Sequence, residues 1–183
     1  AVVKLDVVAS VAPGVNAAGA VALEARPVTL TLAGSGVTTP AAVFASFRAG
    51  VTGTLAQHTG SIAAKSDDVD VVATFGGGVR MGKRTDGTQE TAWVGALDTL
   101  ANRGALALKL EAPAPLEIAR DRIRVGATRI AVAEGRADLA YLALYEGRIA
   151  TQGTFTGIPF TALARLAGTR LPFQSTLVLG GDW

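Results

Sequence analysis

The sequence predicts a mainly β protein, and three observations support this class. Segments rich in β-branched residues recur along the 183 residues about every dozen positions, with turn residues between them. Aromatic residues make up only 5% of the chain, so its apolar mass consists of Ala, Val and Leu, which suits thin, repeated β-structure. The 22 glycines fit many turns. Both a solenoid-like sheet and a globular sandwich are compatible with these features.

Alternating apolar and polar residues define the predicted strands. Leu106, Leu108 and Leu110, for example, alternate with Ala107 and Lys109, as on a half-buried strand. The predicted strands are 2–8, 21–32, 51–57, 69–75, 105–110, 116–125, 128–132, 137–145, 148–155 and 171–179. In segment 21–32 the apolar parity changes at Pro27, which predicts a bend or bulge there.

Two segments have the spacing of short helices. Segment 157–168 has Pro159 near its start and Gly168 at its end, with apolar residues three apart between them. Segment 39–50 has Pro40 in its first turn and an apolar cluster behind it. Both helices are expected to cap or plug an apolar surface.

Composition excludes several classes of function. The formal charge is +2 and the basic residues are scattered, so the footprint of a nucleic-acid-binding protein is missing. Without cysteine there are no disulfides, thiol nucleophiles or thiolate metal sites. No run reaches the roughly 18 apolar residues that a membrane helix needs. Because the chain begins without Met and stops just after a strand, we expect residues 1–183 to be a single segment of a longer protein.

The sequence "GGVRMGKR" resembles a phosphate-binding loop in the spacing of Gly77, Gly82 and Lys83. The position after the lysine should be Ser or Thr, to hold Mg²⁺, and here it is Arg84. The segment that follows also looks like a turn into another strand rather than a helix that would receive phosphate. A polar hairpin is therefore the favoured interpretation.

Other polar residues do not form a catalytic constellation. His58 is the single histidine, and a structural or surface role is favoured over a triad or a metal site. Asp67, Asp68 and Asp70 lack the glycine and distal glutamate of a calcium loop and are expected to lie in a solvated turn. Two carboxylates would suffice for glycoside hydrolysis, but nothing selects a pair. We expect no enzyme activity, no catalytic residue, no metal and no cofactor.

Arg120, Arg122 and Arg124 fall on one face of a predicted strand. The favoured interpretation is a charged outer face that prevents edge aggregation. The alternative is a rim of guanidinium groups for anionic head groups.

Short structural motifs along the second half of the chain carry a family resemblance. They are Trp93, Gly95, Leu97 and Leu100, then Leu110, Pro113 and Ala114, then "GTFTGIPFTAL" at 153–163, with "GTLAQH" at 53–58 upstream. On these residues the chain resembles the TamB family, within the AsmA-like group of bacterial envelope proteins. The resemblance covers roughly residue 43 to the end.

This resemblance implies a periplasmic segment of a protein anchored in the inner membrane by a helix outside the segment. It implies an elongated sheet curled into an open apolar trough, called a β-taco, that conducts phospholipids toward the outer membrane. The partners it implies are phospholipid acyl chains, a TamA-like outer-membrane barrel and unfolded outer-membrane protein strands. The second hypothesis is a scaffold that receives such strands, for example of autotransporter type, along a sheet edge. The third is a closed β-helix adhesin or hydrolase with a packed interior.

Periodicity assigns one set of apolar residues to the inside of the expected trough, where acyl chains would lie. These lipid-groove residues are Leu30, Leu32, Leu55, Val71, Phe75, Leu106, Leu108, Leu110, Ile130, Val132, Leu139, Tyr141, Ile149, Phe155, Phe173, Leu177 and Leu179.

Overall fold

The computed structural model describes residues 4–11, 15–16, 19–20, 25–38, 43–83, 87–166 and 175–183. Over these ranges the protein is mainly β, with a single short α-helix, α1 (Phe160–Leu166). The strands are β1 (Lys4–Val11), β2 (Val15–Asn16), β3 (Gly19–Ala20), β4 (Pro27–Thr38), β5 (Val43–Thr54), β6 (His58–Lys65), β7 (Asp70–Lys83), β8 (Gln89–Asn102), β9 (Leu108–Leu110), β10 (Ala114–Ala119), β11 (Arg122–Val125), β12 (Thr128–Val132), β13 (Gly135–Tyr145), β14 (Arg148–Pro159) and β15 (Val178–Asp182).

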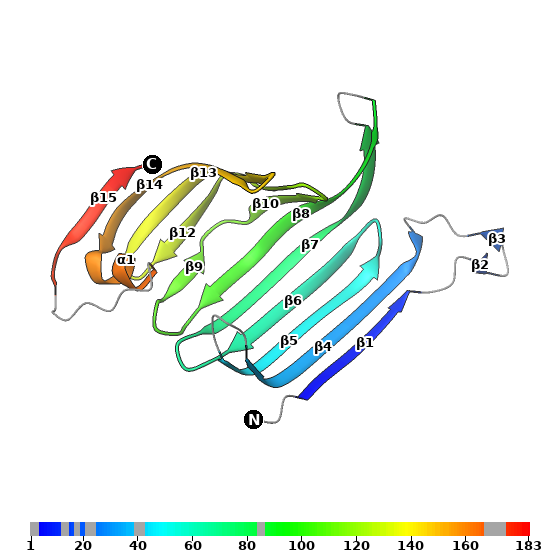
Figure 1. The fold of residues 1–183 in the computed structure, drawn as a ribbon, viewed down its shortest axis with the longest axis horizontal. Helices are drawn as coiled ribbons and strands as arrows, with labels where there is room; N and C mark the ends of the chain where they lie inside the picture. The colour runs from blue at the N-terminus through cyan, green and yellow to red at the C-terminus, as the bar shows by residue number, and fades with distance from the viewer. Residues whose placement is uncertain are drawn as a thin grey trace.

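Thirteen of these strands form one antiparallel sheet, and β2 and β3 form a separate two-stranded ribbon. Strands β1, β4, β5, β6, β7 and β8 pair in that order, so that successive strands of the chain lie side by side (Figure 1). At the other end β13, β14 and β15 continue the same pattern. Short connections between sequence neighbours are the simplest way to build such a meander.

The middle of the sheet contains two interrupted strands. Both β9 and β10 pair with β8, and both β11 and β12 pair with β13. The gaps between the halves retain cross-strand hydrogen bonds: the Glu111 amide donates to the Arg129 carbonyl, the Thr128 hydroxyl donates to the Ala112 carbonyl, and the Gly126 amide donates to the Pro115 carbonyl, each at 2.8 Å. Each pair of halves therefore acts as one strand of the meander.

The sheet curls into a partial ring (Figure 1). In β8 an extra residue, Asp98, lies opposite the step from Thr74 to Phe75 of β7, and in β13 a register shift lies between Leu139 and Tyr141. A third lies between Phe155 and Ile158 in β14. Because a bulge bends its strand and increases the local twist, shifts in three strands contribute to the curl.

Helix α1 packs on the sheet at its C-terminal end. Ala162 of the helix, Val132 of β12 and Ile158 of β14 form the buried cluster of the described residues. Leu106, Ile130, Ala137 and Phe155 pack around it. The Arg165 guanidinium donates a 2.9 Å hydrogen bond to the Ala105 carbonyl, which ties the helix to the loop between β8 and β9. The helix predicted in 157–168 is thus confirmed, and it covers an apolar surface as expected.

The helix predicted in 39–50 is wrong over its described part, because residues 43–50 belong to strand β5. Phe44 and Phe47 have the spacing of one helical face, yet in the strand they lie on opposite faces. Residues 39–42 lie outside the described residues. Proline 27 is the first residue of β4, a position where a proline does not remove a ladder hydrogen bond.

Other predicted boundaries differ from the structure. Strands β6 and β8 are absent from the predicted strands, and segment 116–125 divides into β10 and β11 around a turn. The strand expected at 105–110 is limited to β9, and that expected at 171–179 begins at Val178 in the described residues. The mainly β class and the curled, single large sheet agree with the prediction.

Candidate functional site

The registers assign one face of the sheet to apolar side chains. Directly opposite residues in neighbouring strands point to the same side, so a row can be followed across the sheet. One row across β4 to β10 consists of Leu30, Val51, Gly60, Phe75, Leu97 and Ala114. We call the side that carries this row the apolar face.

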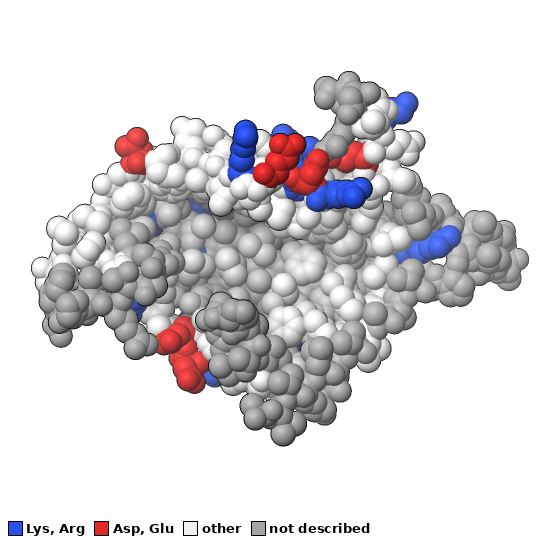
Figure 2. Space-filling model, viewed as in Figure 1, with Lys and Arg blue, Asp and Glu red and all other residues white. Residues whose placement is uncertain are grey.

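The opposite side, the polar face, carries hydroxyl and charged groups. The next row along the same strands is Thr31, Gly50, Ser61, Thr74 and Thr99. The hydroxyls of Thr74 and Thr99 are hydrogen-bonded at 2.7 Å. Figure 2 looks onto the hollowed side of the sheet, where the middle is uncharged and charged side chains gather at the rim. The apolar face therefore lines the inside of the curl.

Few residues of the apolar face are fully buried in the part of the chain that the structure describes. Among the described residues, seven hydrophobic residues are buried, four of them alanines, and no large side chain is fully buried. The chain exposes 11920 Å², whereas a compact monomer of 18.5 kDa exposes about 8,200 Å². Helix α1 covers the β12–β14 end. Over β4–β8 the large side chains Leu30, Val51, Phe75 and Leu97 of the apolar face are half-buried.

Three aromatic rings on the apolar face lie against glycines of the neighbouring strands. A Cβ at Gly60 would come 2.2 Å from the Phe75 Cζ, and one at Gly77 would come 2.5 Å from the Trp93 Cζ2. A Cβ at Gly153 would come 2.4 Å from Trp183, the residue that follows β15. Large rings opposite glycine recover the contact that glycine itself lacks. The rings consequently fill recesses in the sheet.

Trp93 also joins His58 into a polar pair on this face. The indole Nε1 donates to His58 Nε2 at 2.7 Å, and His58 Nδ1 lies 2.9 Å from the Thr54 carbonyl. Since Nε2 accepts from Trp93, Nδ1 carries the proton that is donated to Thr54. Phe75 meets Trp93 edge-on, with 6.0 Å between ring centroids. The histidine thus has the structural role that the sequence favoured.

Most of the predicted lipid-groove residues are on the apolar face. By register this group comprises Leu30, Leu32, Val71, Phe75, Leu108, Leu110, Ile130, Val132, Leu139, Ile149, Phe155 and Leu179. Leu110 and Val132 are buried, whereas Ile149, at a hairpin end, is 70% exposed. Leu106 lies in a loop and packs against the cluster beneath α1.

Four other predicted lipid-groove residues are not among the described strand residues of the apolar face. Tyr141 lies on the polar face, paired with Gln152 and 43% exposed, because the bulge after Leu139 shifts the alternation by one residue. Leu55 lies in the loop between β5 and β6, and Leu177 precedes β15 and is 54% exposed. Phe173 lies outside the described residues.

The prediction missed several members of the apolar face. They are Phe47, Val51, Ile62, Trp93, Leu97, Leu100, Leu116, Ile118, Ile123, Val125, Leu142, Leu144 and Ile158. Strict alternation within β8 and β10 would have found Leu97 and Leu116. The positions of Leu142 and Leu144 depend on the bulge, for which the sequence offers no clear signal.

The motifs rejected on sequence are parts of the sheet. Gly77 and Gly82 lie within strand β7, so no helix follows that would receive phosphate. Asp67 and Asp68 lie in the β6–β7 turn, where the Ser66 amide donates to the Val69 carbonyl at 2.7 Å. The hairpin interpretation is confirmed, and so is the solvated turn for Asp67 and Asp68, whereas Asp70 is the first residue of β7 and is half-buried.

Arg122 is the centre of an ionic cluster on the polar face. Its Nη2 lies 2.5 Å from Glu117 Oε1 and 3.2 Å from Glu90 Oε2. The hydrogen bond with Glu117, and then the one with Glu90, raise the pKa of Arg122 further above its usual range, against the opposing effect of burial. Arg124 is more exposed and lies 3.9 Å from the same Glu117. Arg120 belongs to the turn between β10 and β11.

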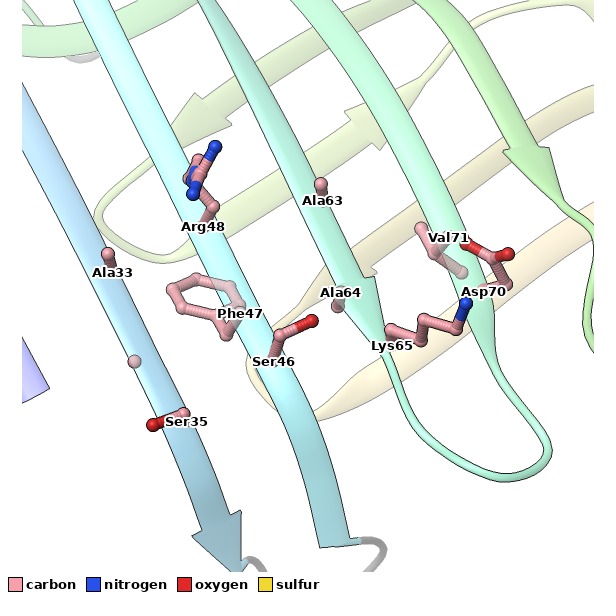
Figure 3. A pocket seen from close by; sticks show the side chains of 11 residues that line it. Ala33, Ser35, Ser46, Phe47, Arg48, Ala63, Ala64, Lys65, Asp70 and Val71 are labelled. Atoms are coloured by element: carbon pink, nitrogen blue, oxygen red, sulfur yellow. The ribbon is translucent and has the colours of Figure 1, made fainter. Parts of the chain in front are cut away.

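Two open cavities border the sheet. The first, of about 560 Å³, is lined by residues of β4 to β7, and Figure 3 shows Arg48, Lys65 and Asp70 extending there from three neighbouring strands. Ala33 and Ala63, on either side of Arg48, also line this cavity and have short side chains. The second, of about 690 Å³, lies beside α1 and includes Leu106 and Ala162. Neither contains a nucleophile paired with a base.

No grouping of His, Cys, Asp and Glu within the described residues is arranged to hold a metal ion. In the same part of the chain, no helix has the length and apolar character needed to cross a membrane. Comparison with models of protein families, with curated proteins and with solved structures finds no match to this chain.

Proposed function

We propose that this chain is a segment of a periplasmic protein, anchored in the inner membrane outside this segment, whose apolar face forms an open, β-taco-like trough for phospholipid acyl chains. The observation that carries the proposal is the apolar face over β4–β8, on the hollowed side of the curl, where the large side chains Leu30, Val51, Phe75 and Leu97 are only half-buried. A hollowed apolar surface that is only half-buried favours an apolar occupant. The TamB-like motifs support the same assignment, with a TamA-like barrel as outer-membrane partner.

The chemistry of the face suits transport rather than catalysis. Burying an acyl chain gains about 0.8 kcal/mol per methylene without directional bonds. Displacing the chain by one carbon exchanges nearly equal contacts, so binding and sliding are compatible. In this proposal the segment is a binding and transfer module without a catalytic residue.

Photocrosslinking at two adjacent residues of β5 tests the proposal. Val51 belongs to the apolar face and Thr52 to the polar face, and both lie far along the chain from α1. A benzoylphenylalanine at Val51 is expected to capture phospholipid from vesicles of phosphatidylethanolamine and phosphatidylglycerol, whereas the same group at Thr52 is not. Equal capture, or none at Val51, would refute the trough.

The edge of β15 favours a second candidate, a scaffold for outer-membrane protein strands. Trp183 exchanges both backbone hydrogen bonds with Gly153 of β14, so the Asp182 amide and carbonyl point away from β14. Strand β15 has no lysine or proline to block pairing. Asp182→Pro should abolish capture of an extended outer-membrane peptide if this function holds, while leaving lipid crosslinking at Val51 unchanged.

A further inference from the structure

The rings of Phe75 and Trp93 lie on the apolar face that we propose as a path for acyl chains, and the inference drawn from them rests on that proposed function. Gly60 of β6, Phe75 of β7 and Val51 of β5 are opposite one another in one row of the apolar face. Without a side chain at Gly60, the Phe75 ring lies over the neighbouring strand instead of standing up from the sheet. Trp93 lies against Gly77 and Gly95, with its ring plane inclined by 75° to that of Phe75.

Phe75, Trp93 and His58 form a surface that we call the floor of the path. The polar side-chain atoms of the floor are hydrogen-bonded. Trp93 Nε1 is bound to His58 Nε2, and His58 Nδ1 to the Thr54 carbonyl. Unpaired polar atoms would oppose the passage of a hydrocarbon chain, since burying them costs free energy. With these bonds made, the two side chains present ring carbons rather than free donors or acceptors.

We infer that Gly60 and Phe75 set the depth of the path, and hence determine that it accepts an unbranched fatty-acyl chain lying along the floor. A ring in its recess leaves room above it. A ring lifted by a methyl group at position 60 would occupy the space of the acyl chain. Phe75 is on this view a specificity-determining residue, and Gly60 acts through it as a positioning residue.

Gly60 is the position at which this can be tested cleanly. The three atoms nearest to a Cβ there all belong to the Phe75 ring, at 2.2 to 2.7 Å. At Gly77 and Gly95 a Cβ would also meet backbone, 2.6 Å from the Val94 oxygen and 2.2 Å from the Gly76 oxygen respectively, so that substitution would distort the strands. Gly50 is the matched control, because it lies on the polar face and a Cβ there has no atom closer than 3.9 Å.

The experiment measures binding of 11-(dansylamino)undecanoic acid to the whole chain by its fluorescence. Gly60→Ala is expected to weaken binding about tenfold, which corresponds to losing contact with about two methylenes. Gly50→Ala is expected to bind like the wild type. Phe75→Leu in the Gly60→Ala background should restore binding, because the displaced ring is gone. Unfolding by urea, followed for each variant, separates a loss of fold from a loss of binding.

The outcomes distinguish the two proposals. Absence of binding by the wild type would overturn the lipid trough itself. Binding by the wild type with an unchanged Gly60→Ala would overturn the depth inference alone. Failure of Phe75→Leu to rescue would also overturn it, because the glycine would then act through the strand and not the ring. If Gly60→Ala does not fold, Phe75→Trp provides the enlarged ring with the glycine retained, and unchanged binding by that variant would contradict the inference.

Discussion

The indole N–H of Trp93 donates a 2.7 Å hydrogen bond to Nε2 of His58 across the intervening strand β7. The bond links β8 to β6, two strands that do not pair with each other. It is possible because Gly77 of β7 has no side chain to separate the rings. A histidine that is 35 residues away in sequence thereby orients an indole ring on the apolar face.

Trp93→Phe should therefore destabilise the fold by about 1–2 kcal/mol, because it leaves His58 Nε2 without its donor in a half-buried site. Urea unfolding followed by circular dichroism measures the change. Trp183→Phe is the control, since Trp183 is 44% exposed and its Nε1 donates to the Thr151 hydroxyl at 3.1 Å. Equal losses for the two variants would show that the His58 bond contributes nothing specific.

Two isoleucines of β14 should respond very differently to truncation. Ile158 is 3% exposed in the cluster beneath α1, and Ile149 is 70% exposed at the hairpin end. Ile158→Ala is expected to cost about 2–4 kcal/mol, because it removes buried methyl groups and leaves a cavity. Ile149→Ala should remain within about 0.5 kcal/mol of the wild type. Similar free energies of unfolding for both variants would mean that α1 does not pack on the sheet as described.

Alternation along the chain predicted the class of the fold and much of the apolar face, because side-chain direction in a strand has a period of two. It could not predict β6, whose sequence "HTGSIAAK" is small and polar and becomes a strand by pairing with β5 and β7. It also misplaced Tyr141, since a single bulged residue reverses the faces of everything that follows.

The recessed rings were likewise beyond sequence reasoning. Gly60 and Phe75 are opposite each other only once the β6–β7 register is known. His58 and Trp93 carry no sequence signal of their contact, because the strand between them must first place Gly77 beneath the indole. Pattern within a strand was informative, whereas contacts across strands required the structure.

Replacing Arg122 or Arg124 by alanine tests whether the ion pairs of the polar face stabilise the sheet. Arg122 bonds both Glu117 and Glu90 with one-fifth of its side chain exposed, and its replacement leaves the two carboxylates facing each other. Arg122→Ala should cost about 1–3 kcal/mol in the free energy of unfolding. Arg124→Ala should cost less than about 0.5 kcal/mol, because its single, longer pair is solvent-exposed. A reversed order would place the stabilising interaction outside this cluster.

Asp138, also on the polar face, should make the stability of the fold depend on pH. Arg129 Nε lies 2.6 Å from its Oδ1, and this hydrogen bond, with a further contribution from Arg136, lowers the pKa of Asp138 below the ordinary value of 3.8. A carboxyl whose pKa is lower in the folded state stabilises the fold above its unfolded pKa, and this contribution is lost as the pH falls through the folded pKa.

Arg129→Gln removes the main partner of Asp138, so it should be less stable than the wild type at neutral pH. The difference should shrink on acidification as the pH falls through the folded pKa of Asp138, because the carboxyl then becomes protonated in both proteins. Urea unfolding of the two proteins across this range measures the difference directly. Glu134, in the adjacent β12–β13 turn, supplies the control, because Glu134→Gln removes a carboxylate outside this pair and should leave the wild-type profile unchanged. A wild-type advantage that is constant from neutral to acid pH would assign the effect of Arg129 to packing of its aliphatic stem rather than to the Asp138 charge.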